Sequence, residues 1–268
     1  MVDGLLYRGA PRRLRSRYRR VGALRIHERY SERESAPIVV LLHGMGVSSR
    51  YFLPTAGRLA SRCTVYAPDL PGFGLSAPLG KRVTVRGLAD AFEAWLDAAG
   101  LQMPHALVAN SFGCQVVADF AARRPERAMR LVLVGPTIDR RARSLGQQAA
   151  RLALDSVREP VGLLAVETVD YVLHIRKSGV AGFVEMVRDP VECKLRRVRA
   201  PTVVVRGDRD PIVPHTWAAE VAATLPRGRL VEVPGAAHAV NYNAPGALAR
   251  LILDFLHEPA NGSSTASA

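Results

Sequence analysis

Lysine is almost missing from this chain, because only Lys81, Lys177 and Lys194 accompany its arginines among 37 basic residues. Arginine therefore supplies nearly all of the net charge of +13, a bias that a GC-rich genome produces without any polyanionic partner. No nucleic-acid motif occurs, and aromatic residues do not interleave with the basic ones as nucleic-acid-binding surfaces require. We therefore expect no nucleic-acid partner.

The arginine excess is concentrated at the amino terminus. Residues 1–20 hold seven arginines against one acid, Asp3. One interpretation is a solvated basic arm over residues 1–18, and the other is an arm that docks to an acidic surface. No further sequence feature supports docking, so the solvated arm is the favoured interpretation.

Cysteine is scarce as well. Cys63, Cys114 and Cys193 are odd in number, far apart and without metal-ligand spacing, which excludes a disulfide framework and indicates no metal site. No phosphate-binding loop or dinucleotide fingerprint is present, so we expect no cofactor.

Long apolar runs are also lacking. No stretch approaches the roughly 18–20 apolar residues that a membrane-spanning helix needs. The first residues contain neither an apolar core nor a small-residue cleavage site, so they do not read as a secretory signal. These features predict a cytoplasmic protein without membrane insertion, whose partner is a small molecule.

What the sequence does contain is an alternation of short apolar runs with amphipathic stretches of helical length. Predicted strands cover 21–30, 38–42, 63–67, 106–109, 131–134, 202–205 and 230–233. Predicted helices cover 50–61, 84–99, 112–124, 216–225 and 245–257. This order predicts an α/β fold with a mostly parallel central sheet and helices on both faces.

One interval interrupts the alternation. Between Val134 and Thr202 the pattern is helical, with no convincing strand. Such an excursion is most simply an inserted helical cap over residues 136–199, lying on the sheet edge where α/β folds bind ligands. The core would then comprise residues 19–135 and 200–258, followed by a disordered tail over 259–268.

Ser111 stands where a predicted strand meets a predicted helix. A tight turn there requires small residues two positions to either side, and Ala109 and Gly113 satisfy this. The helix dipole would favour negative charge beside the hydroxyl. A plain helix N-cap explains Ser111 equally well when this segment is taken alone.

Five segments in this order resemble the α/β-hydrolase superfamily over about residues 20–257, in its serine-esterase branch with a helical cap. They are His43-Gly-Met-Gly46, Asp69-Leu-Pro-Gly-Phe-Gly-Leu-Ser76, Asn110-Ser-Phe-Gly113, Gly207-Asp-Arg-Asp-Pro-Ile-Val-Pro214 and Pro234-Gly-Ala-Ala-His238. The resemblance implies the α/β-hydrolase fold and a triad of Ser111, Asp210 and His238. Ala109 replaces the first glycine of the usual G-x-S-x-G pattern.

The resemblance also assigns supporting roles. Asp210 is favoured over Asp208 as the acid, with Asp208 as a residue that bonds its own turn. The oxyanion hole would use the backbone N–H groups of Met45 and Phe112. Gly44 and Gly46 would leave room for the substrate at this turn.

The expected activity is hydrolysis of an apolar carboxylic ester through an acyl-enzyme on Ser111. Apolar residues at helical spacing in the cap would either line the acyl pocket or pack the cap onto the core; they are Leu163, Val166, Val169 and Leu173. A lactone and a carbon–carbon bond of the meta-cleavage type remain alternatives, although Ala239 stands where the latter enzymes often carry an aromatic residue. A receptor that keeps the fold is the alternative from another class.

Overall fold

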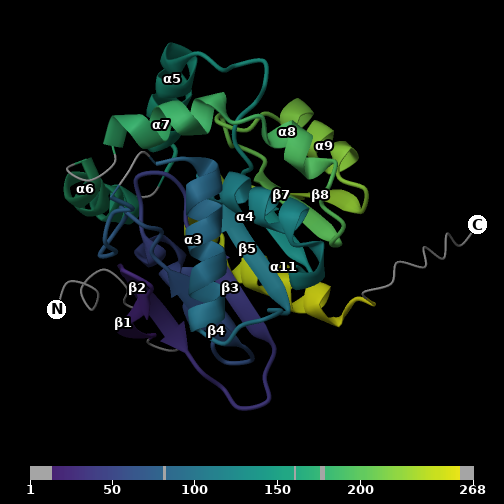
Figure 1. Cartoon of the computed structure of the whole chain (residues 1–268). Coiled ribbons are helices and arrows are strands. Elements are labelled where there is room, and N and C mark those ends of the chain that lie inside the picture. Colours follow the sequence, from purple (N-terminus) through teal and green to yellow (C-terminus); the bar gives the residue numbers. More distant parts are fainter. Residues whose placement is uncertain (1–13, 81–82, 160, 176–178, 260–268) are drawn as a thin grey trace, which may run out of the picture.

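The computed structural model describes residues 14–80, 83–159, 161–175 and 179–259, and an eight-stranded sheet forms its centre (Figure 1). The strands are β1 (Arg15–Val21), β2 (Leu24–Ser31), β3 (Ile38–Leu42), β4 (Thr64–Pro68), β5 (Ala106–Asn110), β6 (Leu131–Val134), β7 (Thr202–Gly207) and β8 (Gly228–Val233). Their spatial order is β1-β2-β4-β3-β5-β6-β7-β8. The six strands from β3 to β8 pair in parallel with one another. Strand β2 pairs antiparallel with β4 on one side and with β1 on the other.

The helical elements follow the strands in alternation. They are η1 (Ser49–Phe52), α2 (Leu53–Leu59), α3 (Val85–Ala98), α4 (Phe112–Arg123), η2 (Pro125–Arg127), α5 (Leu145–Ser156), α6 (Val161–Ile175), α7 (Gly179–Arg188), α8 (Val191–Leu195), α9 (His215–Thr224), α10 (Val240–Asn243) and α11 (Pro245–His257). Thr84 caps α3 by accepting the N–H of Gly87. The α/β fold class predicted from the sequence is confirmed.

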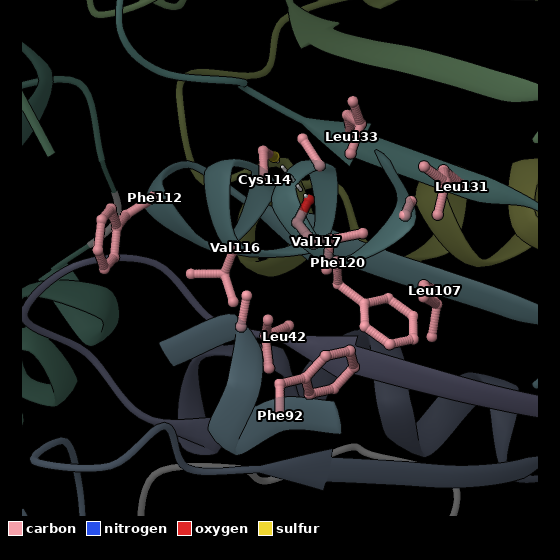
Figure 2. Close-up of a cluster of buried hydrophobic side chains, with 14 of the residues drawn as sticks. Leu42, Phe92, Leu107, Phe112, Cys114, Val116, Val117, Phe120, Leu131 and Leu133 are labelled. Atoms are coloured by element: carbon pink, nitrogen blue, oxygen red, sulfur yellow. Dashed lines mark hydrogen bonds between the residues drawn. The ribbon is translucent and has the colours of Figure 1, made fainter. Parts of the chain in front are cut away.

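The two faces of the sheet bury separate apolar cores. One core packs α3, α4 and α9 against the sheet, and Figure 2 shows its centre, where Phe92 and Phe120 meet Leu42, Leu107 and Leu131. The other core packs α2 and α11 against the opposite face. Because the parallel strands are covered on both sides, they read as continuous apolar runs in the sequence.

Four helices, α5 to α8, occupy the chain between β6 and β7, and the described part of this segment contributes no strand to the sheet. In Figure 1, α5, α6 and α7 lie together at one end of the sheet. We call α5, α6 and α7 the inserted helices. Asp170 of α6 ties them to the core, because it accepts hydrogen bonds from Ser48 and Arg50.

The amino-terminal prediction was wrong in two respects. The sequence suggested a solvated arm up to residue 18 and one strand over 21–30, whereas β1 begins at Arg15 and forms a hairpin with β2. Gly22 turns the hairpin with a φ of 55°. Residues 1–13 of the expected arm and 260–268 of the expected tail lie outside the described residues.

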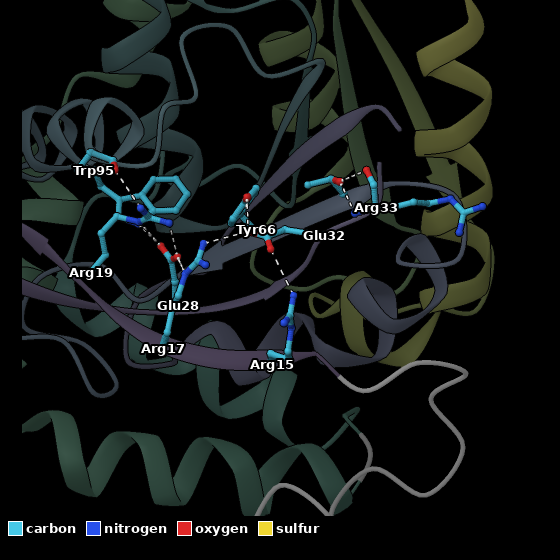
Figure 3. A network of polar contacts seen from close by, with 10 residues as sticks. Arg15, Arg17, Arg19, Glu28, Glu32, Arg33, Tyr66 and Trp95 are labelled. Carbon is cyan, nitrogen blue, oxygen red and sulfur yellow. Dashed lines mark hydrogen bonds and ion pairs between the residues drawn. The ribbon is translucent and has the colours of Figure 1, made fainter. Parts of the chain in front are cut away.

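A buried carboxylate explains why so many arginines suit this strand. Glu28 of β2 is fully buried, and it accepts hydrogen bonds from Arg17, Arg19 and Trp95, as Figure 3 shows. Burial alone would raise the pKa of Glu28, but these three donors hold it below its usual range. The hairpin is therefore attached to α3 through a charge that requires its partners.

We predict that Glu28→Gln lowers the free energy of unfolding by about 2–4 kcal/mol, because the two arginines lose their partner. Glu28 has a lowered pKa, so its contribution is present above pH 4.5 and is lost as the pH falls below that value. Urea denaturation at pH 7 and at pH 4 measures both effects. The exposed Glu34→Gln is the control, expected within about 0.5 kcal/mol of wild type; equal losses in the two variants would contradict the prediction.

Candidate active site

Ser111 occupies the sharp turn between β5 and α4. Its backbone has a φ of 53°, in the left-handed region that non-glycine residues rarely adopt, and its N–H donates to the carbonyl of Val134 at 2.8 Å. A Cβ atom at Gly113 would lie 2.6 Å from the carbonyl oxygen of His43, so only glycine fits there. Ser111 makes no side-chain cap hydrogen bond to α4, which removes the N-cap explanation.

His238 follows β8 and points its ring toward β7. Its Nδ1 atom lies 2.8 Å from Oδ2 of Asp210, and both side chains are buried. The other carboxylate oxygen of Asp210 accepts the N–H groups of Ile212 and Val213. Since Nδ1 donates to a carboxylate, Nε2 of the neutral ring is left as a proton acceptor.

Gly135 leaves the space that the His238 ring needs. This residue has a φ of 53°, and a Cβ atom there would lie 2.8 Å from Cε1 and 2.9 Å from Nδ1 of His238. The ring of His238 therefore packs directly against the turn after β6, in addition to its contact with Asp210. The sequence analysis did not single out Gly135.

Asp208 has a different partner from Asp210. Its Oδ1 atom accepts the N–H of Gly235 at 2.7 Å. The expectation that Asp208 bonds its own turn was therefore wrong, because the carboxylate bridges to the neighbouring loop after β8. The structure does not bring Asp208 into hydrogen-bond contact with His238.

A cavity of about 270 Å³ lies between the carboxyl ends of the strands and the inserted helices. The end of β5 contributes Asn110, and loops after the strands contribute Gly44, Met45, Gly46, Val47, Ser111, Thr137, Ile212 and His238. Tyr51 of η1 and seven residues of the inserted helices complete the described wall; the seven are Gln148, Ala149, Leu152, Asp155, Glu167, Phe183 and Met186. Ser111 and His238 therefore line the same cavity.

The residues assigned to the oxyanion hole lie on two sides of Ser111. Met45 lines the cavity, whereas the Phe112 side chain packs into the core beside α4 (Figure 2). Phe112 begins α4, and the first N–H groups of a helix have no partner within it. Of the residues expected to bind substrate, Gly44 and Gly46 line the cavity.

The side chain of Leu173 lies outside the described residues. Other apolar residues that the sequence suggested for an acyl pocket do not line the cavity. Leu163 and Val166 are buried, and Leu163 packs with Val47, Tyr51 and Ala239, while Val169 is exposed. The two buried residues, Leu163 and Val166, therefore face the interior of the protein, and Val169 does not.

Helix α5 and the turn that follows it also hold the loop that carries His238. Asp155 of α5 accepts the N–H of His238 at 3.3 Å, and Glu159 accepts the N–H of Ala239 at 2.8 Å. Burial alone would lower the pKa of His238, but the carboxylates of Asp210, Asp155 and Glu159 raise it to about 9. The sequence analysis missed Asp155 and Glu159, which look like ordinary surface charges of a helix.

His43 has a structural role at the turn after β3. Its Nδ1 donates to the carbonyl of Gly44 at 2.8 Å, and its Nε2 accepts the N–H of Leu70 at 2.9 Å. Burial lowers the pKa of this ring. The histidine therefore braces the turn and has no free ring nitrogen for proton transfer.

A second arrangement of serine, histidine and aspartate lies on the amino-terminal hairpin. Ser16 Oγ is 2.9 Å from Nε2 of His27, whose Nδ1 is 2.8 Å from Oδ2 of Asp69. Asp69 also accepts the N–H groups of Ser49 and Leu75. None of the three lines the cavity, so this arrangement fastens the hairpin to the Asp69 loop.

This sheet, with a serine turn after β5 and a histidine after β8, defines an α/β-hydrolase architecture. The chain belongs to the alpha/beta hydrolase family, whose model matches residues 39–251. A pimeloyl-(acyl-carrier protein) methyl ester esterase of Chromobacterium violaceum is 28% identical, over 76% of this chain and 87% of that protein. A 2-hydroxy-6-oxononadienedioate/2-hydroxy-6-oxononatrienedioate hydrolase of Pseudomonas putida is 27% identical, over 90% of this chain and 96% of that protein.

Solved structures share the fold. The enol-lactonase of Burkholderia xenovorans superposes with a TM-score of 0.76, covering 90% of this chain and all of that one at 22% identity. The chain is therefore an enzyme of the α/β-hydrolase family, and its named relatives support hydrolase activity. Among the helices of the described residues, none is long and apolar enough to cross a bilayer.

We predict that the imidazole of His238 titrates at about pH 9 in NMR spectra, as the signal that is lost in His238→Asn. Asp155→Asn should lower this pKa by about one unit, because a negative charge is removed while the amide oxygen can still accept the His238 N–H. Glu126→Gln, at an exposed position, is the control without effect. Titration of wild type near 6.5 would contradict the electrostatic account.

Proposed function

We propose that this enzyme is a serine hydrolase that cleaves a carboxylic ester through an acyl-enzyme on Ser111. The observation that carries the proposal is the cavity shared by Ser111 and His238, with the histidine bonded to Asp210. A serine in left-handed backbone at a strand–helix turn is the geometry that presents a nucleophile above a parallel sheet.

In the proposed reaction, the neutral form of His238, which predominates only above its pKa of about 9, takes the proton of Ser111 at Nε2 as Oγ attacks the carbonyl carbon of the ester. Asp210 stabilises the resulting imidazolium, which then protonates the departing alcohol. Water activated by His238 attacks the acyl-enzyme, releases the carboxylic acid and restores Ser111. The N–H groups of Met45 and Phe112 would bind the oxyanion in both steps.

We further propose that residues 136–199 act as a cap on a core formed by residues 19–135 and 200–258. The cavity supports this division, because one side of its wall comes from the loops after the strands and the other from the inserted helices. A cap placed there would select the substrate while the core performs the chemistry.

Ester hydrolysis is favoured over carbon–carbon bond cleavage. Ala239 is fully buried against Tyr51 and Leu163, so the position after His238 presents no aromatic ring to the substrate. The alternative from another class, a receptor that binds without turnover, is separated from an enzyme by the following experiment.

Ser111→Ala should reduce hydrolysis of p-nitrophenyl acetate by at least about a thousandfold, since the nucleophile is removed. A fluorophosphonate probe should label wild type at Ser111, as identified by peptide mass spectrometry. Ser16→Ala provides the control, because Ser16 also contacts a histidine but lies outside the cavity. Labelling at Ser16 in place of Ser111 would overturn the assignment.

Asp210→Asn should reduce kcat by about a thousandfold or more, because an amide cannot hold His238 in the required tautomer or stabilise its charged form. Asp208→Asn is the matched variant, expected within about threefold of wild type, since the amide oxygen can still accept the N–H of Gly235. Kinetics with p-nitrophenyl acetate and circular dichroism of both variants give the comparison. A larger loss for Asp208→Asn would show that the acid has been misassigned.

A further inference from the structure

The cavity carries negative charge that the proposed ester chemistry does not use. Asp155 of α5 and Glu167 of α6 both line its wall. Among the described residues of that wall, none is lysine or arginine. A chain with a net charge of +13 therefore presents an acidic interior at its candidate active site.

These two carboxylates differ from Glu159, which follows α5, and from Asp170 of α6, both of which are satisfied by protein donors. Glu159 accepts hydrogen bonds from Ala239 and Asn243, and Asp170 accepts them from Ser48 and Arg50. Asp155 receives only the 3.3 Å bond from the His238 backbone, and no group of the described residues donates to Glu167. Both carboxylates line the cavity, so their oxygens can accept further hydrogen bonds from a ligand there.

Burial makes the charged forms of Asp155 and Glu167 unfavourable when no positive group lies beside them. It raises the pKa of Asp155 to about 6 and, helped by the negative charges of Glu159 and Asp155, raises the pKa of Glu167 to about 7. His238 is the one basic group that faces them from the described cavity wall. Even with His238 protonated, the charges of Asp155, Glu167 and Asp210 leave an excess of negative charge around the site.

A buried hydroxyl points to a ligand independently of the acids. Thr137, in the turn after β6, is only 2% exposed and lines the cavity. Its Oγ1 atom has no hydrogen-bond partner within the described part of the chain. Since buried hydroxyl groups are almost always hydrogen-bonded, a polar group of the substrate is the natural partner.

The remaining wall suits a cation with an aliphatic chain. Tyr51 and Phe183 supply aromatic rings, and Met45 and Met186 supply thioethers. Aromatic rings attract an ammonium group, and a carboxylate does so more strongly when both are removed from water. An anionic chain would instead add a negative charge beside two carboxylates.

We propose that Asp155, Glu167 and Thr137 form a subsite for an ammonium group, so that the ester cleaved by Ser111 carries a positively charged amine. The inference rests on the proposed function for its link to catalysis. It replaces the purely apolar ester expected from the sequence, which would leave Glu167 and the Thr137 hydroxyl without a hydrogen-bond donor or acceptor and Asp155 with only the 3.3 Å bond from His238.

Three ligands of equal chain length test the subsite without any turnover: hexylammonium, 1-hexanol and hexanoate. Calorimetry with the Ser111→Ala variant at pH 8 should show hexylammonium binding at least about tenfold more tightly than 1-hexanol, with hexanoate the weakest. Hexylammonium should also compete with p-nitrophenyl acetate in wild type, which places it in the same cavity. Equal binding of hexylammonium and 1-hexanol, or preference for hexanoate, would overturn the proposal.

Substitutions test whether Asp155 and Glu167 are the groups that bind the ammonium ion. In the Ser111→Ala background, Glu167→Gln and Asp155→Asn should each lower the preference for hexylammonium over 1-hexanol about threefold or more. Glu185→Gln is the matched control, because Glu185 lies on α7 and bonds the N–H of Val85 outside the cavity wall. An unchanged preference in both Glu167→Gln and Asp155→Asn would show that these carboxylates do not form the subsite.

The two proposals fail in different ways. Absence of p-nitrophenyl acetate hydrolysis, or hydrolysis that survives Ser111→Ala, would reject the serine mechanism while the binding comparison still decides the subsite. Serine-dependent hydrolysis combined with no preference for hexylammonium would reject the subsite alone.

Discussion

The backbone turn at Ser111 is the constraint around which the other parts of the site are arranged. Its left-handed conformation brings the start of α4 against β3, where Gly113 lies close to the carbonyl oxygens of Leu42 and His43. The Ser111 N–H is bonded to Val134 at the end of β6. Three neighbouring strands must therefore end in register for this turn to form, and that register also aligns the loops that surround the cavity.

The strands, helices and site residues that could be predicted from the sequence are those marked by a pattern of neighbouring residues. Buried parallel strands such as 131–134 produce continuous apolar runs, and the cap at Thr84 marks a helix start. Asp210 and His238 each follow a predicted strand, so their loops were expected at one edge of the sheet. Their hydrogen bond follows from that placement, together with the space that Gly135 leaves for the ring.

The parts that sequence reasoning missed depend on contacts between distant segments. Strand β1 has an arginine at every second position and no apolar face, because its pairing with β2 is stabilised by the charge of Glu28. Asp155 lies 83 residues from its partner His238, and in the sequence it looks like any acidic residue on a solvated helix. Its burial appears only once the inserted helices are folded over the strand ends.

The arginines of β1 affect which strands can pair with the outer edge of the sheet. Within the described residues this strand pairs with β2 alone, so one row of its backbone N–H and C=O groups has no strand partner there. Exposed edges of this kind are templates on which further strands can add. A second copy of β1 aligned there would set arginines against arginines, and this repulsion disfavours growth of the sheet from chain to chain. Charged side chains on an edge strand are one of the means by which sheets avoid edge-to-edge pairing, and the arginines of β1 fit that description.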